Sequence, residues 1–104
     1  MNKVLEEKKL TKAEVVKKSG IEKSYVYYIF SGEKENPSRS KLIAVCMAME
    51  MELEEVQKLL KSTGFSRLYP KILMDSIIIY GINNHMTVME VNEYLYELGL
   101  DILE

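Results

Sequence analysis

Apolar residues recur three and four positions apart along most of the chain, which is the spacing of one face of an α-helix. The segment 69–82 is apolar on nearly all sides, and Pro70 suits its first turn. Its β-branched run "SIII" leaves a short strand as the alternative, although the length of the segment favours a helix. The pattern therefore predicts an all-α protein with helical segments 2–10, 10–20, 22–31, 38–50, 53–64, 69–82 and 86–99.

Two of these segments begin with the same local signal. Thr11 and Glu14 have the spacing of a capping box, in which the hydroxyl accepts from one amide and the carboxylate from the other, and Thr87 and Glu90 repeat it. Gly20 is expected to end the first of these helices with a positive φ. The likeness between the two segments has two explanations, an internal duplication or chance similarity of capped helices. The apolar face expected for segment 10–20 consists of Ala13, Val15 and Val16.

The segment 22–31 has an apolar stripe and a polar remainder. Val26, Ile29 and Phe30 stand at positions i, i+3 and i+4, so they are expected to be buried together. The side chains expected to point away from that stripe are Lys23, Ser24, Tyr27 and Tyr28. A short capped helix, a glycine turn and this second helix make a helix-turn-helix, whose second helix suits the major groove of DNA. The amides at the start of the first helix would then face the phosphate backbone.

The ordered set of residues around this motif resembles the lambda-repressor-like helix-turn-helix family, the XRE or Cro/C1 type. The resemblance covers about residues 2–60 and implies a five-helix bundle, often a dimer, that binds operator DNA. Residues 1–64 would form that domain, and residues 65–104 a two-helix C-terminal extension. The residues that carry the resemblance are Thr11, Lys12, Glu14, Gly20, Ile21, Lys23, Ser24, Val26, Ile29, Ser31, Gly32, Pro37 and Ser38.

The family's DNA contacts can be carried over position by position. The resemblance implies a phosphate contact at the start of the first motif helix, base and phosphate contacts along the second, and backbone contacts from the following loop and helix start. The DNA-binding residues expected on this basis are Lys12, Lys23, Ser24, Tyr25, Tyr27, Tyr28, Lys34, Asn36, Ser38, Arg39 and Lys41.

The chain departs from the family pattern at several positions. Val16 and Glu50 stand where alanine and glycine are usual, and Glu22 lies at the tip of the second motif helix. Tyrosines replace most of the usual readout chemistry there, and tyrosine is favoured in protein interfaces. The alternative function is therefore a protein–protein interaction adaptor on the same fold, which would use Tyr25, Tyr27 and Tyr28.

Charge divides the chain into two halves. Residues 1–41 hold ten basic and six acidic residues, a net charge of +4, whereas residues 42–104 hold four and ten, a net charge of −6. Only the first half suits a polyanionic partner such as double-stranded DNA. The extension 65–104 has three readings: it caps the bundle, it binds a protein partner or small ligand, or it forms a homodimer interface through Met74, Ile78, Ile82, Met89 and Tyr96.

Other chemistry has little support in the sequence. Cys46 is the one cysteine and stands in an apolar stretch, which predicts a buried thiol and excludes an internal disulfide. His85, the one histidine, falls in a predicted loop. No nucleophile motif, phosphate loop or metal-ligand spacing occurs, so we expect no enzyme activity, no metal and no cofactor. With no signal peptide, and with "SIIIYGI" too short to cross a bilayer, a cytoplasmic protein is expected.

Overall fold

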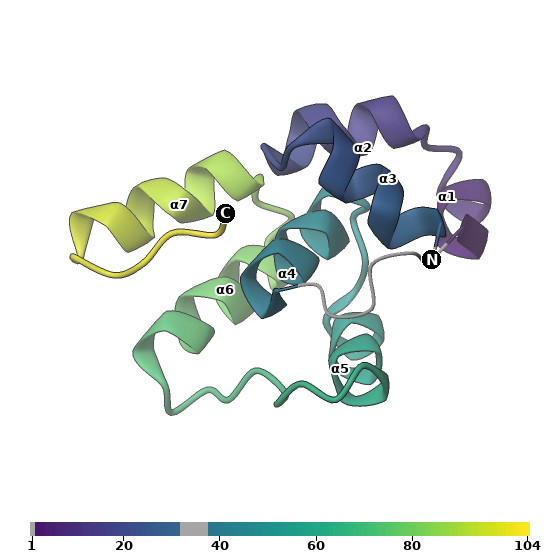
Figure 1. Ribbon diagram of the computed structural model, residues 1–104. Helices are drawn as coiled ribbons and strands as arrows, with labels where there is room; N and C mark the ends of the chain where they lie inside the picture. The colour runs from purple at the N-terminus through teal and green to yellow at the C-terminus, as the bar shows by residue number, and fades with distance from the viewer. Residues whose placement is uncertain (1, 32–37) are drawn as a thin grey trace.

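The computed structural model describes residues 2–31 and 38–104, and this part of the chain contains α-helices and no strand (Figure 1). The all-α prediction is confirmed, and the run "SIII" lies inside a helix. No helix among the described residues is long and apolar enough to span a membrane. The helices are α1 (Asn2–Lys8), α2 (Lys12–Ser19), α3 (Lys23–Ser31), α4 (Arg39–Ala48), α5 (Leu53–Ser62), α6 (Leu73–Asn83) and α7 (Val88–Glu97).

Helix α4 occupies the centre of the molecule, with α2, α5 and α7 packed on it (Figure 1). Every residue from Leu42 to Met49 is buried, so this helix is apolar on all sides because it is covered on all sides. The same apolar character along segment 69–82 predicts a deeply buried helix there too. There the expectation is wrong, since α6 lies at the edge of the bundle and leaves Leu73 and Tyr80 58% and 60% exposed.

Two smaller expectations also fail for local reasons. Ala13 is exposed, because α2 turns Val15 and Ser19, one helical turn apart, toward the core. Pro70 precedes α6 instead of starting it. The Ile72 amide donates to the Tyr69 carbonyl at 3.0 Å, and this turn delays the helix to Leu73.

The same turn joins α1 to α2, α4 to α5 and α6 to α7. In each, a residue with positive φ is followed by a hydrophobe and then by the N-cap of the next helix; the positive-φ residues are Lys9 (56°), Glu50 (56°) and His85 (54°). Each N-cap amide donates to the carboxylate of the glutamate three residues later. The acceptors are Glu14 at 3.1 Å, Glu55 at 3.0 Å and Glu90 at 2.9 Å. Both capping boxes expected from the sequence are confirmed, and α3 is the helix that stands outside this repeated hairpin.

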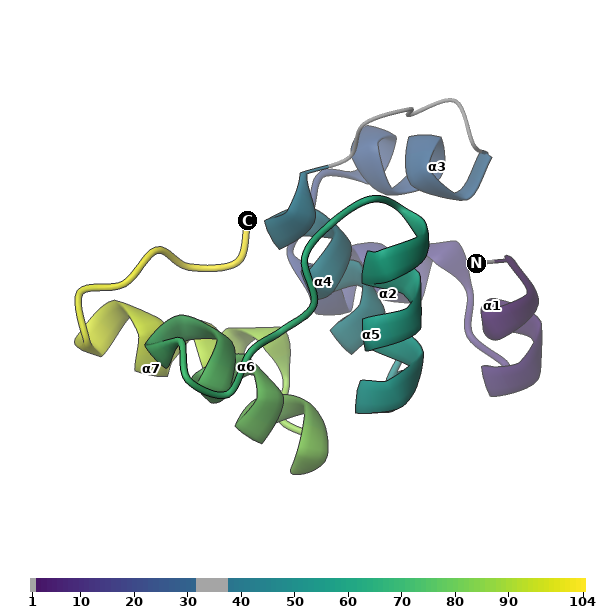
Figure 2. The ribbon, with the colours of Figure 1, turned by 90° about the horizontal axis from the view of Figure 1, so that it is seen from below.

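A second repeated device follows α5 and α7. The side-chain amide of Gln57 exchanges two hydrogen bonds with the backbone of Leu68, at 2.9 and 2.8 Å. Asn92 does the same with Leu103, at 3.1 and 2.7 Å. Because both leucines are 2% exposed, each amide fastens the chain that leaves its helix onto the core. The C-terminal tail therefore runs back along α7 toward α4 (Figures 1 and 2).

Gly81 marks the closest approach of α6 and α7. A Cβ atom added there would lie 2.4 Å from Cγ2 of Val91, which is itself fully buried. We expect Gly81→Ala to lower the free energy of unfolding by about 2–3 kcal/mol, because neither helix can move apart without disturbing the core. Urea unfolding measures this. The double variant with Val91→Ala removes the clashing methyl and should lose less than the sum of the two single variants; strict additivity would contradict the clash.

Cys46 is fully buried on α4, as the sequence predicts. Burial, with the carboxylate of Glu55 adding to it, raises the pKa of the thiol from 9.0 to about 12. The protonated thiol is thus favoured by folding, so its contribution to stability is complete below about pH 9 and is lost as the pH rises toward 12. We expect a disulfide reagent at pH 8 to label Cys46 only as fast as the protein unfolds. Immediate labelling of the native protein, at the rate of the urea-denatured control, would contradict this.

Candidate nucleic-acid interface

The turn between α2 and α3 is built by short local bonds. Gly20 has φ +70° and its amide donates to the Val16 carbonyl at 3.2 Å, which ends α2. The Ser19 hydroxyl accepts from the amide of Ile21 at 3.2 Å, and the Ile21 side chain is buried. Val26 and Phe30 are buried as expected, with Ile29 half-buried beside them. Helix α3 therefore lies at the rim of the molecule, away from α6 and α7 (Figure 2).

Tyr27 brings two lysines from different helices together. The Lys12 ammonium, at the start of α2, lies 5.6 Å from the centroid of the Tyr27 ring. The Lys23 ammonium, at the start of α3, lies 5.6 Å from the same centroid. Both distances are within the range of a cation–π interaction. Tyr27, half-buried, thus holds two cations where the two motif helices begin, and we call these three residues the lysine–tyrosine cluster.

Tyr25 makes a comparable link from α3 to α4. Its hydroxyl accepts from the backbone amide of Ser38 at 2.6 Å, and Lys41 lies with its ammonium 4.6 Å from the ring centroid. Ser38 is the N-cap of α4, and its hydroxyl accepts from the Lys41 amide at 3.1 Å. Tyr25 is partly buried against the core, so Tyr28, at 48% exposure, is the tyrosine of α3 that is open to solvent.

Acidic groups moderate the charge of this face. The Ser24 hydroxyl donates to the exposed Glu22 carboxylate at 2.9 Å, so the two side chains are held together at the tip of α3. Glu14 is occupied in the capping box with Thr11. Among the described residues, the cations with contacts to the rings of α3 are thus Lys12, Lys23 and Lys41.

Arg39 is engaged inside the chain. Its guanidinium donates to the carbonyls of Ser66 and Arg67, at 3.1 and 3.2 Å, and lies 3.5 Å from the Asp75 carboxylate. Asp75 is buried and also accepts from the Tyr69 amide at 3.0 Å. The sequence suggested a free phosphate contact for Arg39, whereas the structure joins it to the loop between α5 and α6. A lone aspartate inside the apolar run "ILMDSIII" was the signal that could have indicated a buried partner.

Two of the predicted DNA contacts, the one histidine and the possible metal ligands remain to be placed. Lys34 and Asn36 lie outside the described residues. His85 is exposed in the turn between α6 and α7, as expected of a loop histidine. Among residues 2–31 and 38–104, no group of three or more His, Cys, Asp and Glu side chains is placed to hold a metal ion.

The fold and this face define a helix-turn-helix protein. Residues 1–66 match the family model of the Cro/C1-type HTH DNA-binding domain, so the chain belongs to that family. The match covers α1 to α5 and includes every residue of the lysine–tyrosine cluster. Searches of curated proteins and of solved structures found no match.

Proposed function

We propose that this protein is a small transcriptional regulator that sets α3 in the major groove of its operator DNA. The observation that carries the proposal is the gathering of three lysines from three helices onto aromatic rings of α3. Lys12 and Lys23 lie on Tyr27, Lys12 is also 5.8 Å from the centroid of the Phe30 ring, and Lys41 lies on Tyr25. Cations held at the starts of α2, α3 and α4 are placed as phosphate contacts on either side of an inserted helix.

The proposed roles separate reading from positioning. Ser24 and Tyr28, on the outer side of α3, reach base edges or sugars, because both are exposed there. Tyr27 positions Lys12 and Lys23, and Tyr25 positions Lys41. Ser38 begins α4 next to the sugar–phosphate backbone of the DNA. Lys34 and Asn36 are proposed as further backbone contacts. Arg39 is given a structural role, which is to hold the loop between α5 and α6, and no DNA contact.

Binding should depend on salt, with a modest slope. The three contacts of Lys12, Lys23 and Lys41 alone give each chain a slope of log K against log salt of about −2.7. A fluorescence anisotropy titration compares a duplex from the gene's own upstream region with a random duplex of equal length. The proposal requires tighter binding to the upstream duplex and an affinity that falls with rising salt at about this slope. Equal affinity for both duplexes at moderate salt, or no salt dependence, would contradict it.

The alternative function, a protein–protein interaction adaptor, has a smaller exposed tyrosine surface on α3 than the sequence suggested. It needs the tyrosines of α3 to be accessible, but Tyr25 and Tyr27 are half-buried and Tyr28 alone is exposed. Tyr28→Ala separates the two functions. If the protein is an adaptor, this variant loses the partner in a pull-down, and the wild type shows no preference for the upstream duplex. If it is a regulator, the variant keeps salt-dependent DNA binding but loses part of its preference for the upstream duplex, because Tyr28 is proposed to reach bases or sugars.

We also propose that α6 and α7 join two copies of the chain. Of the interface residues expected from the sequence, Ile78 and Ile82 are buried within the chain and Met74 is half-buried. The other two expected residues, Met89 (73%) and Tyr96 (79%), are exposed. Further exposed apolar residues of this hairpin are Ile72 (51%), Leu73 (58%), Tyr80 (60%), Tyr94 (52%) and Leu98 (56%). A two-fold pair would present two α3 helices to a palindromic operator.

Sedimentation velocity over a range of protein concentrations tests the pairing. Tyr94 and Leu98 stand one helical turn apart, so Tyr94→Glu with Leu98→Glu should place two charges in the interface and leave a monomer at every concentration. Glu93→Gln with Glu97→Gln changes the same helix without touching the apolar set and should still dimerise. A wild-type protein that stays monomeric at high concentration would refute the interface.

A further inference from the structure

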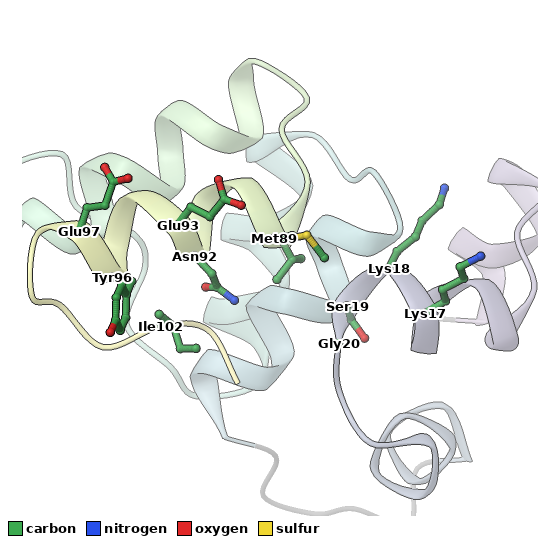
Figure 3. A pocket seen from close by; sticks show the side chains of 11 residues that line it. Lys17, Lys18, Ser19, Gly20, Met89, Asn92, Glu93, Tyr96, Glu97 and Ile102 are labelled. Atoms are coloured by element: carbon green, nitrogen blue, oxygen red, sulfur yellow. The ribbon is translucent and has the colours of Figure 1, made fainter.

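A groove runs between the C-terminal half of α2 and the hairpin of α6 and α7. It consists of two adjoining hollows with volumes of about 440 and 530 Å³. Both are lined by Lys17, Lys18, Val88 and Met89, so they lie side by side, and Figure 3 shows the smaller one. These volumes are in the range of sites for small ligands. The groove lies apart from the lysine–tyrosine cluster, and DNA binding leaves it unexplained.

The lining of the larger hollow combines adaptable apolar side chains with charged and polar ones, which are Glu14, Lys17, Lys18, Glu50, His85 and Thr87. Met47, Met51 and Met86 line it together with Ile82. Methionine has a flexible, polarisable side chain that fits irregular apolar partners. Met89, which lines both hollows, is 73% exposed. An apolar occupant would cover this surface and remove it from water.

The walls of the groove carry opposite charges. Lys17 and Lys18 come from α2, and Glu93 and Glu97 from α7, with Met89 between the two pairs (Figure 3). Lys18 lies 4.0 Å from Glu50, which is a weak, exposed pair. Lys17, Glu93 and Glu97 form no ion pair with any residue in 2–31 or 38–104. The α7 side would repel a purely anionic ligand, whereas Glu14 and Glu50 line the same hollow as Lys17 and Lys18, so the α2 side offers both charges.

We propose that this groove binds a short apolar peptide with free ends. The carboxylate of the peptide faces Lys17 and Lys18, its ammonium faces Glu93 and Glu97, and its apolar side chains lie on the methionines. A zwitterion of this kind matches both walls, and its side chains match the lining between them. The proposal does not rest on DNA binding, since none of these residues belongs to the α3 face.

Methionine-methyl NMR of the full chain tests the proposal with trileucine as the probe. We expect trileucine to shift the methyl signals of Met47, Met51, Met86 and Met89, and to leave that of the core residue Met49 unchanged. Blocking both ends of the peptide, as acetyl-trileucine amide, should weaken binding about tenfold or more. Lys17→Ala with Lys18→Ala should have a similar effect, whereas the exposed pair Lys58→Ala with Lys61→Ala on α5 should have none.

Three results would overturn the proposal. The first is no shift of the four groove methionines at millimolar trileucine. The second is equal binding of the blocked and free peptides, which would remove the role of the charged walls. The third is an equal loss in the α2 and α5 lysine variants, which would make the effect one of net charge. Lys17 and Lys18 are exposed, so these variants are expected to fold.

Discussion

Replacing Lys12 and Lys23 by glutamate is expected to weaken DNA binding about 100-fold at 0.1 M salt and to flatten the slope of log K against log salt by about 2. Both ammonium groups lie 5.6 Å from the Tyr27 ring, at the starts of the two motif helices. Reversal removes two proposed phosphate contacts and adds two repulsive charges. The loss should be nearly the same on every DNA sequence, because phosphate contacts carry no base information.

The control for this experiment is Lys58→Glu with Lys61→Glu. These lysines are exposed on α5 and change the net charge equally. They should leave affinity within about threefold of wild type, since screening reduces distant charges at this salt. An equal loss in both double variants would mean that net charge, and not the α3 face, governs binding.

Tyr27 gives a finer test of the same cluster. Tyr27→Phe keeps the ring that both lysines face and should bind DNA almost as wild type does. Tyr27→Leu removes the ring and should weaken binding by about threefold to tenfold, with circular dichroism confirming that the helices remain. If Tyr27→Phe were as weak as Tyr27→Leu, the hydroxyl would be the important group and the ring would not position the lysines.

Arg39→Ala is expected to lower the free energy of unfolding by about 3 kcal/mol. The change leaves the buried Asp75 carboxylate without its cation, and the carbonyls of Ser66 and Arg67 without a donor. Denaturant unfolding followed by circular dichroism gives the value. DNA affinity, measured well below the unfolding midpoint, should retain its salt slope, because the guanidinium is committed to the α5–α6 loop.

Arg67→Ala is the matched control, because the Arg67 side chain is exposed and its carbonyl remains in the variant. It should cost less than about 0.5 kcal/mol. The double variant of Arg39→Ala with Asp75→Ala should lose less than the two single variants together, as expected of interacting partners. A stable Arg39→Ala protein with a salt slope lowered by about 1 would show instead that Arg39 contacts phosphate.

Local patterns in the sequence were sufficient to predict the helices and the helix-turn-helix motif. The capping boxes of Thr11 and Thr87 join residues three apart, and the positive φ of Gly20 follows from the helix that ends there. The buried stripe of α3 repeats with the helical period. Such features depend on neighbours in sequence, so periodicity and spacing predict them.

The sequence by itself therefore determined an all-α chain, a helix-turn-helix and the family that carries it. The tertiary structure decided that α4 and not α6 is the central helix, that Tyr27 gathers two lysines, and that Arg39 holds a loop through partners 27 and 28 residues away. Each of these depends on which helices pack together. Apolar composition is compatible with several packings, and only the assembled core selects one of them.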